Sequence, residues 1–296
     1  MARIRLVATD VDGTLLDPQG CVTPRTHAAI QALSACGVTL ALATGRRWTG
    51  ASQVAATVGF QGPMIVFDGA MTRSYPNGEI LSAATLNRAA AQHAAEAMAS
   101  YGIQPIVQFS DHMEEYLHVA EDAVHPEWTA AYLPMFQEQI RFRPVAALCD
   151  AGIDPVRLVA FAPLTILRRV AVDLASPAWG RQLLHTGNYG TAELTLFASP
   201  VSKGNALAHL ARRLNIPIEE TMAIGDGLND TSMLRAAGLG VAMGHAPRRV
   251  RASARVVTGS NGEEGWARAI ETYALGSSSG IQTTEGLHVA RNGGSV

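Results

Sequence analysis

The sequence predicts an α/β protein in which a parallel sheet is interrupted by a second, smaller α/β domain. Short apolar runs alternate with helical patterns at both ends of the chain, which is typical of parallel strands joined by helices. The middle of the chain is richer in aromatic residues and breaks this alternation. We expect a core formed by residues 1–82 and 187–275, an inserted α/β domain over 83–186, and a disordered tail over 276–296.

The first 82 residues contain the first half of the alternation. An apolar run at Leu6–Ala8 precedes a helix that begins near Pro24, where Thr23 can cap the helix and proline suits the first turn. Further strands are expected at Val38–Ala43 and Met64–Phe67. A turn at residues 76–78, Pro-Asn-Gly, then separates two short extended runs.

The alternation resumes after the inserted domain. Ser202 can cap a helix whose apolar residues recur every three or four positions. The remaining expected elements are a strand at Thr221–Ile224, a helix from about Asn229 to Gly238, and short runs at Leu239–Ala242 and Arg255–Val257.

The inserted domain shows strand-like runs at Ile106–Phe109 and Arg157–Phe161. We interpret the stretch MEEYLH in the same domain as a strand. His118 and His125 have no partners at metal-ligand spacing, which favours packed or surface roles for both. The polar, Gly/Ser-rich segment that begins with GSSSG is typical of a disordered tail.

Composition limits the function classes. The chain has 296 residues, a formal net charge of −2 and 48% apolar residues, and no apolar stretch is long enough to span a bilayer. We therefore expect a cytoplasmic enzyme that acts on small molecules and has no nucleic-acid or membrane partner. Its oligomeric state is left open. The three cysteines are too scattered for a disulfide framework or a zinc site.

Lysine usage points to one position. All but one of the 23 basic residues are arginines, and the exception is Lys203. A compact ammonium is not equivalent to a planar guanidinium, so Lys203 is a candidate functional residue.

Polar residues lie just past the ends of three of the predicted strands. Asp10 and Asp12 follow the first strand, Thr44 follows the strand at Val38–Ala43, and Asp226 follows the strand at Thr221–Ile224. Ligands of parallel sheets bind at the carboxyl ends of the strands, so these groups should converge. Gly13 lets the backbone turn so that its N–H groups can face an anion.

Clustered carboxylates with one lysine indicate magnesium-dependent phosphoryl chemistry. Asp10 can attack phosphorus and form an aspartyl-phosphate. Asp12 can protonate the leaving oxygen and later deprotonate water. Thr44 and Lys203 can hold the phosphoryl oxygens.

The motifs DVDGTLL, ATGR, SKGNAL and GDGLND, in this order and spacing, resemble the four motifs of the haloacid dehalogenase superfamily, in its Cof-type sugar-phosphatase branch. The resemblance implies a Rossmann-like core, an α/β cap between the second and third motifs, and Mg²⁺-dependent hydrolysis of a small phosphorylated metabolite. It implies catalytic roles for Asp10 and Asp12. The implied metal ligands are Asp10, Asp12 through its carbonyl, Asp226 and, in support, Asp230. Together with the residue patterns, it gives the phosphate-binding set Asp12, Gly13, Thr44, Gly45, Lys203 and Asn229.

One position departs from this branch. It usually reads Asn-Gly-Ala after the third strand, whereas this chain reads Asp68-Gly69-Ala70. The carboxylate leaves the expected chemistry unchanged and leaves the local phosphate or substrate contacts open.

Other functions remain to be compared with hydrolysis. A phosphomutase of the same superfamily, which returns phosphate to its substrate, stays open. A phospho-acceptor signalling module would also use an acidic Mg²⁺ pocket, but it needs neither Asp12 nor a large insertion. A calcium loop is excluded because Leu15 and Cys21 replace its required Gly and Glu. A nucleotide P-loop is excluded because its glycines do not precede Lys203.

Overall fold

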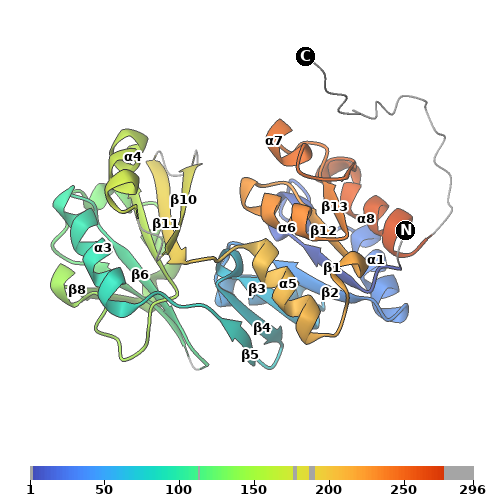
Figure 1. Ribbon diagram of the computed structural model, residues 1–296, viewed down its shortest axis with the longest axis horizontal. Coiled ribbons are helices and arrows are strands. Elements are labelled where there is room, and N and C mark those ends of the chain that lie inside the picture. The colour runs from blue at the N-terminus through green and yellow to red at the C-terminus, as the bar shows by residue number, and fades with distance from the viewer. Residues whose placement is uncertain (1–2, 113, 176–178, 187–190, 277–296) are drawn as a thin grey trace, which may run out of the picture.

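The computed structural model describes residues 3–112, 114–175, 179–186 and 191–276, and it forms two lobes (Figure 1). The chain leaves the first lobe after residue 83 and returns to it after residue 198. The α/β class predicted from the sequence is confirmed. None of the helices in the described ranges combines the length and the hydropathy needed to cross a membrane.

The core lobe is built on one large sheet. Its strands lie in the order β14 (Val256–Val257), β13 (Leu239–Ala242), β12 (Thr221–Gly225), β1 (Leu6–Thr9), β2 (Thr39–Ala43), β3 (Gly62–Val66), β4 (Met71–Tyr75) and β5 (Ile80–Ala83). The first six of these are parallel, while β4 and β5 are antiparallel. The central strands are almost wholly buried apolar runs, as a sheet covered on both faces requires.

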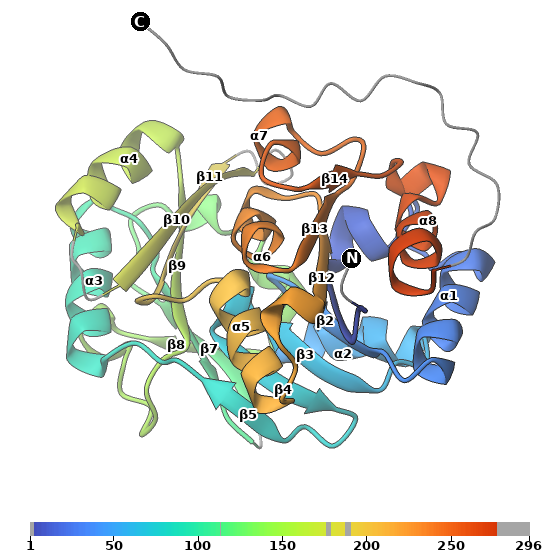
Figure 2. The same ribbon diagram turned by 45° about the vertical axis from the view of Figure 1, so that its right-hand side comes forward.

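Helices cover both faces of this sheet (Figure 2). One face carries α5 (Lys203–Arg213) and α6 (Thr231–Ala236), and the other carries α1 (Pro24–Ala35), α2 (Trp48–Thr57) and α8 (Gly265–Ala269). The short α7 (Arg248–Arg251) lies near β13.

The expected helix caps are present. Thr23 accepts a hydrogen bond from the Thr26 N–H at the start of α1, and Ser202 accepts one from the Asn205 N–H at the start of α5. The predicted helix from Asn229 begins two residues later, at Thr231, because residues 228–230 form a tighter 3₁₀ turn.

The second lobe, which we call the inserted domain, comprises residues 86–198. Its sheet has the order β10 (Trp179–Thr186), β11 (Thr191–Ala198), β9 (Arg157–Ala162), β6 (Ile106–Ser110), β7 (Glu115–Ala120) and β8 (Ile140–Arg143). Helices α3 (Arg88–Ser100) and α4 (Leu164–Asp173) pack on its outer face (Figure 1). A segment of 3₁₀ turns, Leu133–Gln139, packs against the opposite face, which looks toward the core.

The strand β11 corrects one predicted boundary. The sequence places the second part of the core from residue 187 onward, yet β11 pairs with β10 and β9 and so belongs to the sheet of the inserted domain. The return to the core therefore comes after Ala198. The tail was predicted over residues 276–296, and residues 277–296 lie outside the described ranges.

Candidate active site

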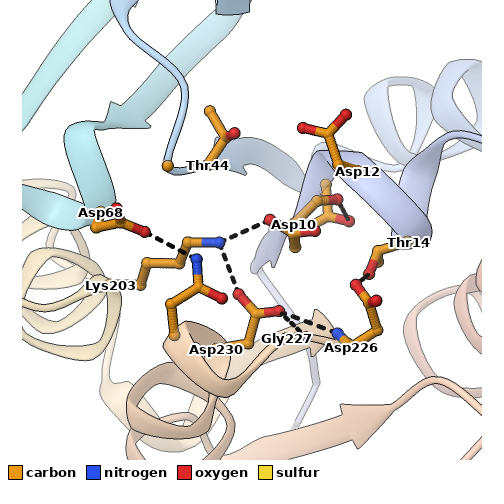
Figure 3. A network of polar contacts seen from close by, with 12 residues as sticks. Asp10, Asp12, Thr14, Thr44, Asp68, Lys203, Asp226, Gly227 and Asp230 are labelled. Atoms are coloured by element: carbon orange, nitrogen blue, oxygen red, sulfur yellow. Dashed lines mark hydrogen bonds and ion pairs between the residues drawn. The ribbon is translucent and has the colours of Figure 1, made fainter. Parts of the chain in front are cut away.

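Three neighbouring strands bring the predicted site residues to one edge of the sheet. β1 pairs with β2 on one side and with β12 on the other, so Thr9 lies level with both Leu42 and Ile224. Asp10 follows β1 directly, and its N–H donates to the Ile224 carbonyl at 2.9 Å. The convergence predicted from the sequence is present (Figure 3).

The turn after β1 requires a glycine. Gly13 has a φ of +78°, and a Cβ atom at this position would come within 2.6 Å of Asp226 Oδ2. Next to it, the Thr14 hydroxyl donates to Asp226 Oδ1 at 2.8 Å. The turn therefore fits closely against Asp226 and orients its carboxylate.

Lys203 lies at the centre of the site. Its side chain is fully buried, and Nζ is 2.6 Å from Asp10 Oδ1 and 2.6 Å from Asp230 Oδ1 (Figure 3). Lys203 is the first residue of α5. The N-cap formed by Ser202 therefore also fixes the backbone position from which the lysine side chain extends. The lysine that the composition singled out is thus the cation shared by two buried carboxylates.

The second carboxylate oxygen of Asp230, Oδ2, is bound by backbone N–H groups. Oδ2 accepts the N–H groups of Asp226 and Gly227 at 3.0 and 2.8 Å. Gly225 leaves room for this carboxylate, because a Cβ there would lie 2.5 Å from Asp230 Cγ. Asp230 therefore links the lysine to the loop that carries Asp226.

The carboxylates form a group suited to a cation. Oxygen atoms of Asp10, Asp226 and Asp230 all lie within 4.8 Å of one another. Asp10 and Asp230 share the Lys203 ammonium, and the partly buried Asp226 adds a third carboxylate beside them, so the acidic side chains of this group outnumber its one lysine. Oxygen ligands of this kind are those that Mg²⁺ prefers.

The pKa shifts of these side chains agree with a surplus of acidic groups in the site. Burial, with the charge of Asp230 added to it, raises the pKa of Asp10 well above its ordinary value. Burial also raises the pKa of Asp230. Burial alone would lower the pKa of Lys203, but Asp10 and Asp230 outweigh it, so its pKa is raised and the amine is charged at neutral pH.

Asp12 is placed differently. Its side chain is 54% exposed and accepts two hydrogen bonds from Arg46, Nε to Oδ2 at 2.8 Å and Nη2 to Oδ1 at 2.6 Å. No dashed contact joins it to Lys203 in Figure 3. The Asp12 carboxylate is therefore outside the three-carboxylate group, and Arg46 emerges as its partner.

The remaining predicted residues also line this edge. Thr44 is buried, and its hydroxyl accepts the Arg46 N–H at 3.1 Å. Asn229 donates through Nδ2 to Asp68 Oδ1 at 2.8 Å. Gly45 packs against Asp68, because a Cβ there would lie 3.0 Å from Asp68 Oδ1.

The unusual Asp68 bridges the two lobes. It has a φ of +55°, a left-handed conformation that aspartate and asparagine tolerate better than most residues. Oδ2 lies 3.7 Å from Nη1 of Arg157, which comes from β9 of the inserted domain. The same Nη1 donates to the Gly45 carbonyl at 3.2 Å. The carboxylate thus faces an arginine of the other lobe.

A cavity of about 990 Å³ opens over the site. Asp10, Asp12, Thr44, Asp226 and Asn229 are among its core-side residues. The inserted domain contributes others, among them Tyr132, Phe136, Gln139, Arg157 and Glu193. A molecule bound here would lie between the two lobes.

Several residues of this cavity were not predicted from the sequence. Arg47, Arg157 and Glu193 are separated by long stretches of chain and share no local motif. Of these three residues, only Arg47 could have been suspected from the sequence, because it directly follows the ATGR motif. His118, by contrast, is buried with Nδ1 2.8 Å from the Leu148 carbonyl, which confirms a packed role.

Comparison with known proteins agrees with the motifs. The profile of the haloacid dehalogenase-like hydrolases matches residues 7–146 and 165–270. An HMP-PP phosphatase of Serratia proteamaculans is 31% identical over 82% of this chain and 84% of its own length. The phosphatase YwpJ of Bacillus subtilis is 28% identical over 90% of this chain and 99% of its own length.

Solved structures share the fold. A phosphatase of the haloalkanoate enzyme superfamily from Bacteroides thetaiotaomicron superposes with a TM-score of 0.78 at 21% identity, covering 92% of this chain and 96% of that one. A haloacid dehalogenase-like hydrolase from the same organism superposes with a TM-score of 0.75 at 24% identity, covering 91% and 99%. With most of its length matched by the family profile, the chain belongs to the haloacid dehalogenase-like hydrolases, in their Cof-type branch, and is a phosphoric monoester hydrolase.

Proposed function

We propose that the protein is a Mg²⁺-dependent phosphatase that hydrolyses small phosphate monoesters, sugar phosphates foremost, through an aspartyl-phosphate at Asp10. One observation carries the proposal: Asp10, Asp226 and Asp230 lie within 4.8 Å of one another, Lys203 binds two of them, and Asp10 and Asp226 line the cavity between the lobes. This arrangement supplies a nucleophile, a cation site and a place for a leaving group together.

The acidic group fits a divalent cation. Asp10 and Asp226, with Asp230 in support and the carbonyl of Asp12, would hold Mg²⁺. When bound, the ion offsets charge on the carboxylates and the phosphoryl oxygens. Lys203, a full positive charge at this point, stabilises the same oxygens.

The first half of the reaction transfers the phosphoryl group to the protein. A carboxylate oxygen of Asp10 bonds to phosphorus as the ester P–O bond breaks. The leaving oxygen takes a proton from Asp12 and departs as an alcohol. Thr44 and Asn229 line the cavity beside Asp10 and are proposed to hold phosphoryl oxygens through side-chain hydrogen bonds.

The second half restores the enzyme. Asp12 removes a proton from water, whose oxygen bonds to phosphorus while the bond between phosphorus and the Asp10 oxygen breaks. Inorganic phosphate leaves, and Asp12 is protonated again for the next turnover. Each half therefore uses Asp12 in the opposite protonation state.

The substrate class rests on the cavity and on the relatives. The cavity is large enough for a small organic group and mixes aromatic with charged side chains. One relative, from Escherichia coli, is a pyridoxal phosphate phosphatase that is 28% identical over 92% of this chain. A small phosphorylated metabolite is the substrate class common to such proteins and to this cavity.

The test is phosphate release. Purified protein with Mg²⁺ should release phosphate from several esters in a panel of phosphorylated sugars, cofactors and p-nitrophenyl phosphate. Asp10→Asn should abolish release and leave the circular dichroism spectrum unchanged, because the substitution removes the nucleophile and little volume. Release by Asp10→Asn near the wild-type rate would contradict the assignment of the nucleophile.

The same panel separates the alternatives. A phosphomutase would move phosphate between positions of one sugar without releasing it. A signalling module would become phosphorylated once and release no phosphate beyond one equivalent.

A further inference from the structure

The helix α2 lacks a cap from its own sequence. Arg47 occupies the N-cap position and makes no side-chain hydrogen bond to the helix. The first N–H groups of any helix need acceptors from outside the helix. At this helix the acceptor comes from the other lobe.

The acceptor is Glu115 on β7 of the inserted domain. Oε1 accepts the Trp48 N–H at 2.8 Å, and Oε2 accepts the Thr49 N–H at 2.8 Å. The Thr49 hydroxyl donates to Oε2 as well, at 2.6 Å. One carboxylate thus satisfies both of the first two N–H groups of α2 and lies at the positive end of its dipole.

This carboxylate is buried where the lobes meet. Glu115 is 7% exposed, and within its own domain the Ser110 hydroxyl donates to Oε1 at 3.3 Å. A buried charge is costly unless donors surround it. Most of these donors belong to the core, so the stability of this contact depends on the two lobes staying together.

A residue of the core, Arg47 at the start of α2, contacts the inserted domain near the same place. The guanidinium of Arg47 lies 3.9 Å from the centre of the Phe136 ring. It also donates to Gln139 Oε1. The start of α2 is therefore held from both lobes, by Glu115 in one direction and by Arg47 in the other.

The same helix start is joined to the site. Only Gly45, Arg46 and Arg47 separate Thr44 from Trp48. Arg46 holds the Asp12 carboxylate, and Thr44 lines the cavity. A shift of the α2 N-terminus would displace both residues.

We infer that Glu115 is a positioning residue: by capping α2 from the inserted domain, it couples closure of the two lobes to the placement of the Thr44–Arg47 loop. The inference rests on the proposed function for its kinetic consequence, whereas the contact itself does not.

The kinetic test compares two neighbouring glutamates. Glu115→Ala should lower kcat/KM for an alkyl phosphate by about tenfold or more, since it removes a helix cap and a charged acceptor together. Glu115→Gln keeps an acceptor without the charge and should recover part of this loss. Glu114→Ala is the control, because Glu114 is half exposed and pairs with Arg141 on the surface. Equal kinetics for Glu115→Ala and Glu114→Ala would overturn the inference.

A second measurement needs no activity. Hydrogen exchange of a peptide covering residues 44–57 should become faster in Glu115→Ala than in the wild type and in Glu114→Ala. Exchange of the central core strands should stay unchanged, and the radius of gyration from small-angle scattering should increase. Faster exchange throughout the core would mean a general loss of stability and would contradict the positioning role. These readouts hold even if the phosphatase proposal fails.

Discussion

The Arg46 guanidinium binds the carboxylate of Asp12 through two parallel hydrogen bonds of 2.6 and 2.8 Å. Such paired bonds fix the orientation of a carboxylate more firmly than one bond does. These contacts bind the ionised form of Asp12. In the proposed reaction Asp12 becomes a proton donor when one of its oxygens leaves Arg46 and takes up a proton, so Arg46 sets the position from which Asp12 acts on the leaving oxygen.

Substitution of Arg46 should therefore affect the leaving group selectively. In Arg46→Ala, kcat/KM for an alkyl phosphate should fall about tenfold more than for p-nitrophenyl phosphate, whose leaving group needs little protonation. Arg46→Lys should lie between, because an ammonium cannot make the two-pronged contact. Arg5→Ala, which removes an exposed pair with Glu220, is the control. Equal losses for both esters would argue against a link between Arg46 and the proton donor.

Lys203 should be essential to both stability and turnover. Lys203→Met leaves Asp10 and Asp230 buried without their cation and should lower the free energy of unfolding by about 3–5 kcal/mol at pH 7. The loss should shrink as the pH falls, because the raised pKa values of Asp10 and Asp230 let them take up protons. Urea denaturation at pH 7 and pH 5 measures the difference. A loss of stability that is the same at both pH values would contradict the charge argument.

Lys203→Arg tests the shape of the cation. The side chain has no exposed surface, so a larger, planar guanidinium has no room there. Phosphate release by this variant should fall about a hundredfold. Activity close to that of the wild type would show that a compact ammonium is not required at this position.

The carboxylate group should bind Mg²⁺ in the folded protein. Mg²⁺ at a hundred times its dissociation constant should stabilise the fold by about 2.7 kcal/mol, visible as a rise in Tm. Asp226→Asn should reduce this rise, whereas Asp154→Asn, which alters an exposed carboxylate near Arg88, should leave it unchanged. A Tm of the wild type that does not respond to Mg²⁺ would remove the support for the metal site.

His118 should make the fold sensitive to acid. Burial lowers its pKa below the ordinary value of 6.5. As the pH falls below 6.5, the unfolded chain takes up a proton that the folded imidazole resists, so stability declines toward the lowered pKa. Urea denaturation between pH 5 and pH 7.5 should show a shallower decline for His118→Gln than for the wild type or for His125→Gln, which alters a partly exposed imidazole that pairs with Glu127. Equal slopes for the two variants would exclude His118 as the source.

The placement of the candidate site residues in the core could be predicted from the sequence because these residues follow local signals. Asp10, Thr44 and Asp226 each follow an apolar run, and parallel strands bring such ends together by their geometry. Lys203 stood out because no other lysine exists. Short-range rules were sufficient for these positions.

The contacts between the two lobes could not be predicted from local sequence patterns. Glu115 is the first residue of a strand and belongs to no local motif, and its capping of α2 depends on how the two domains meet. Arg157 faces Asp68 across more than 80 residues of chain. The sheet membership of β11 was missed for the same reason, because strand pairing depends on partners far along the sequence.

The single lysine also has a consequence for labelling. Lys203 is the one lysine of the sequence, and its side chain is fully buried and charged. Acylating reagents need an exposed, neutral amine, so Lys203 should resist acylation while the protein is folded. Acylation of Lys203 would then report that the packing around this amine has opened to solvent.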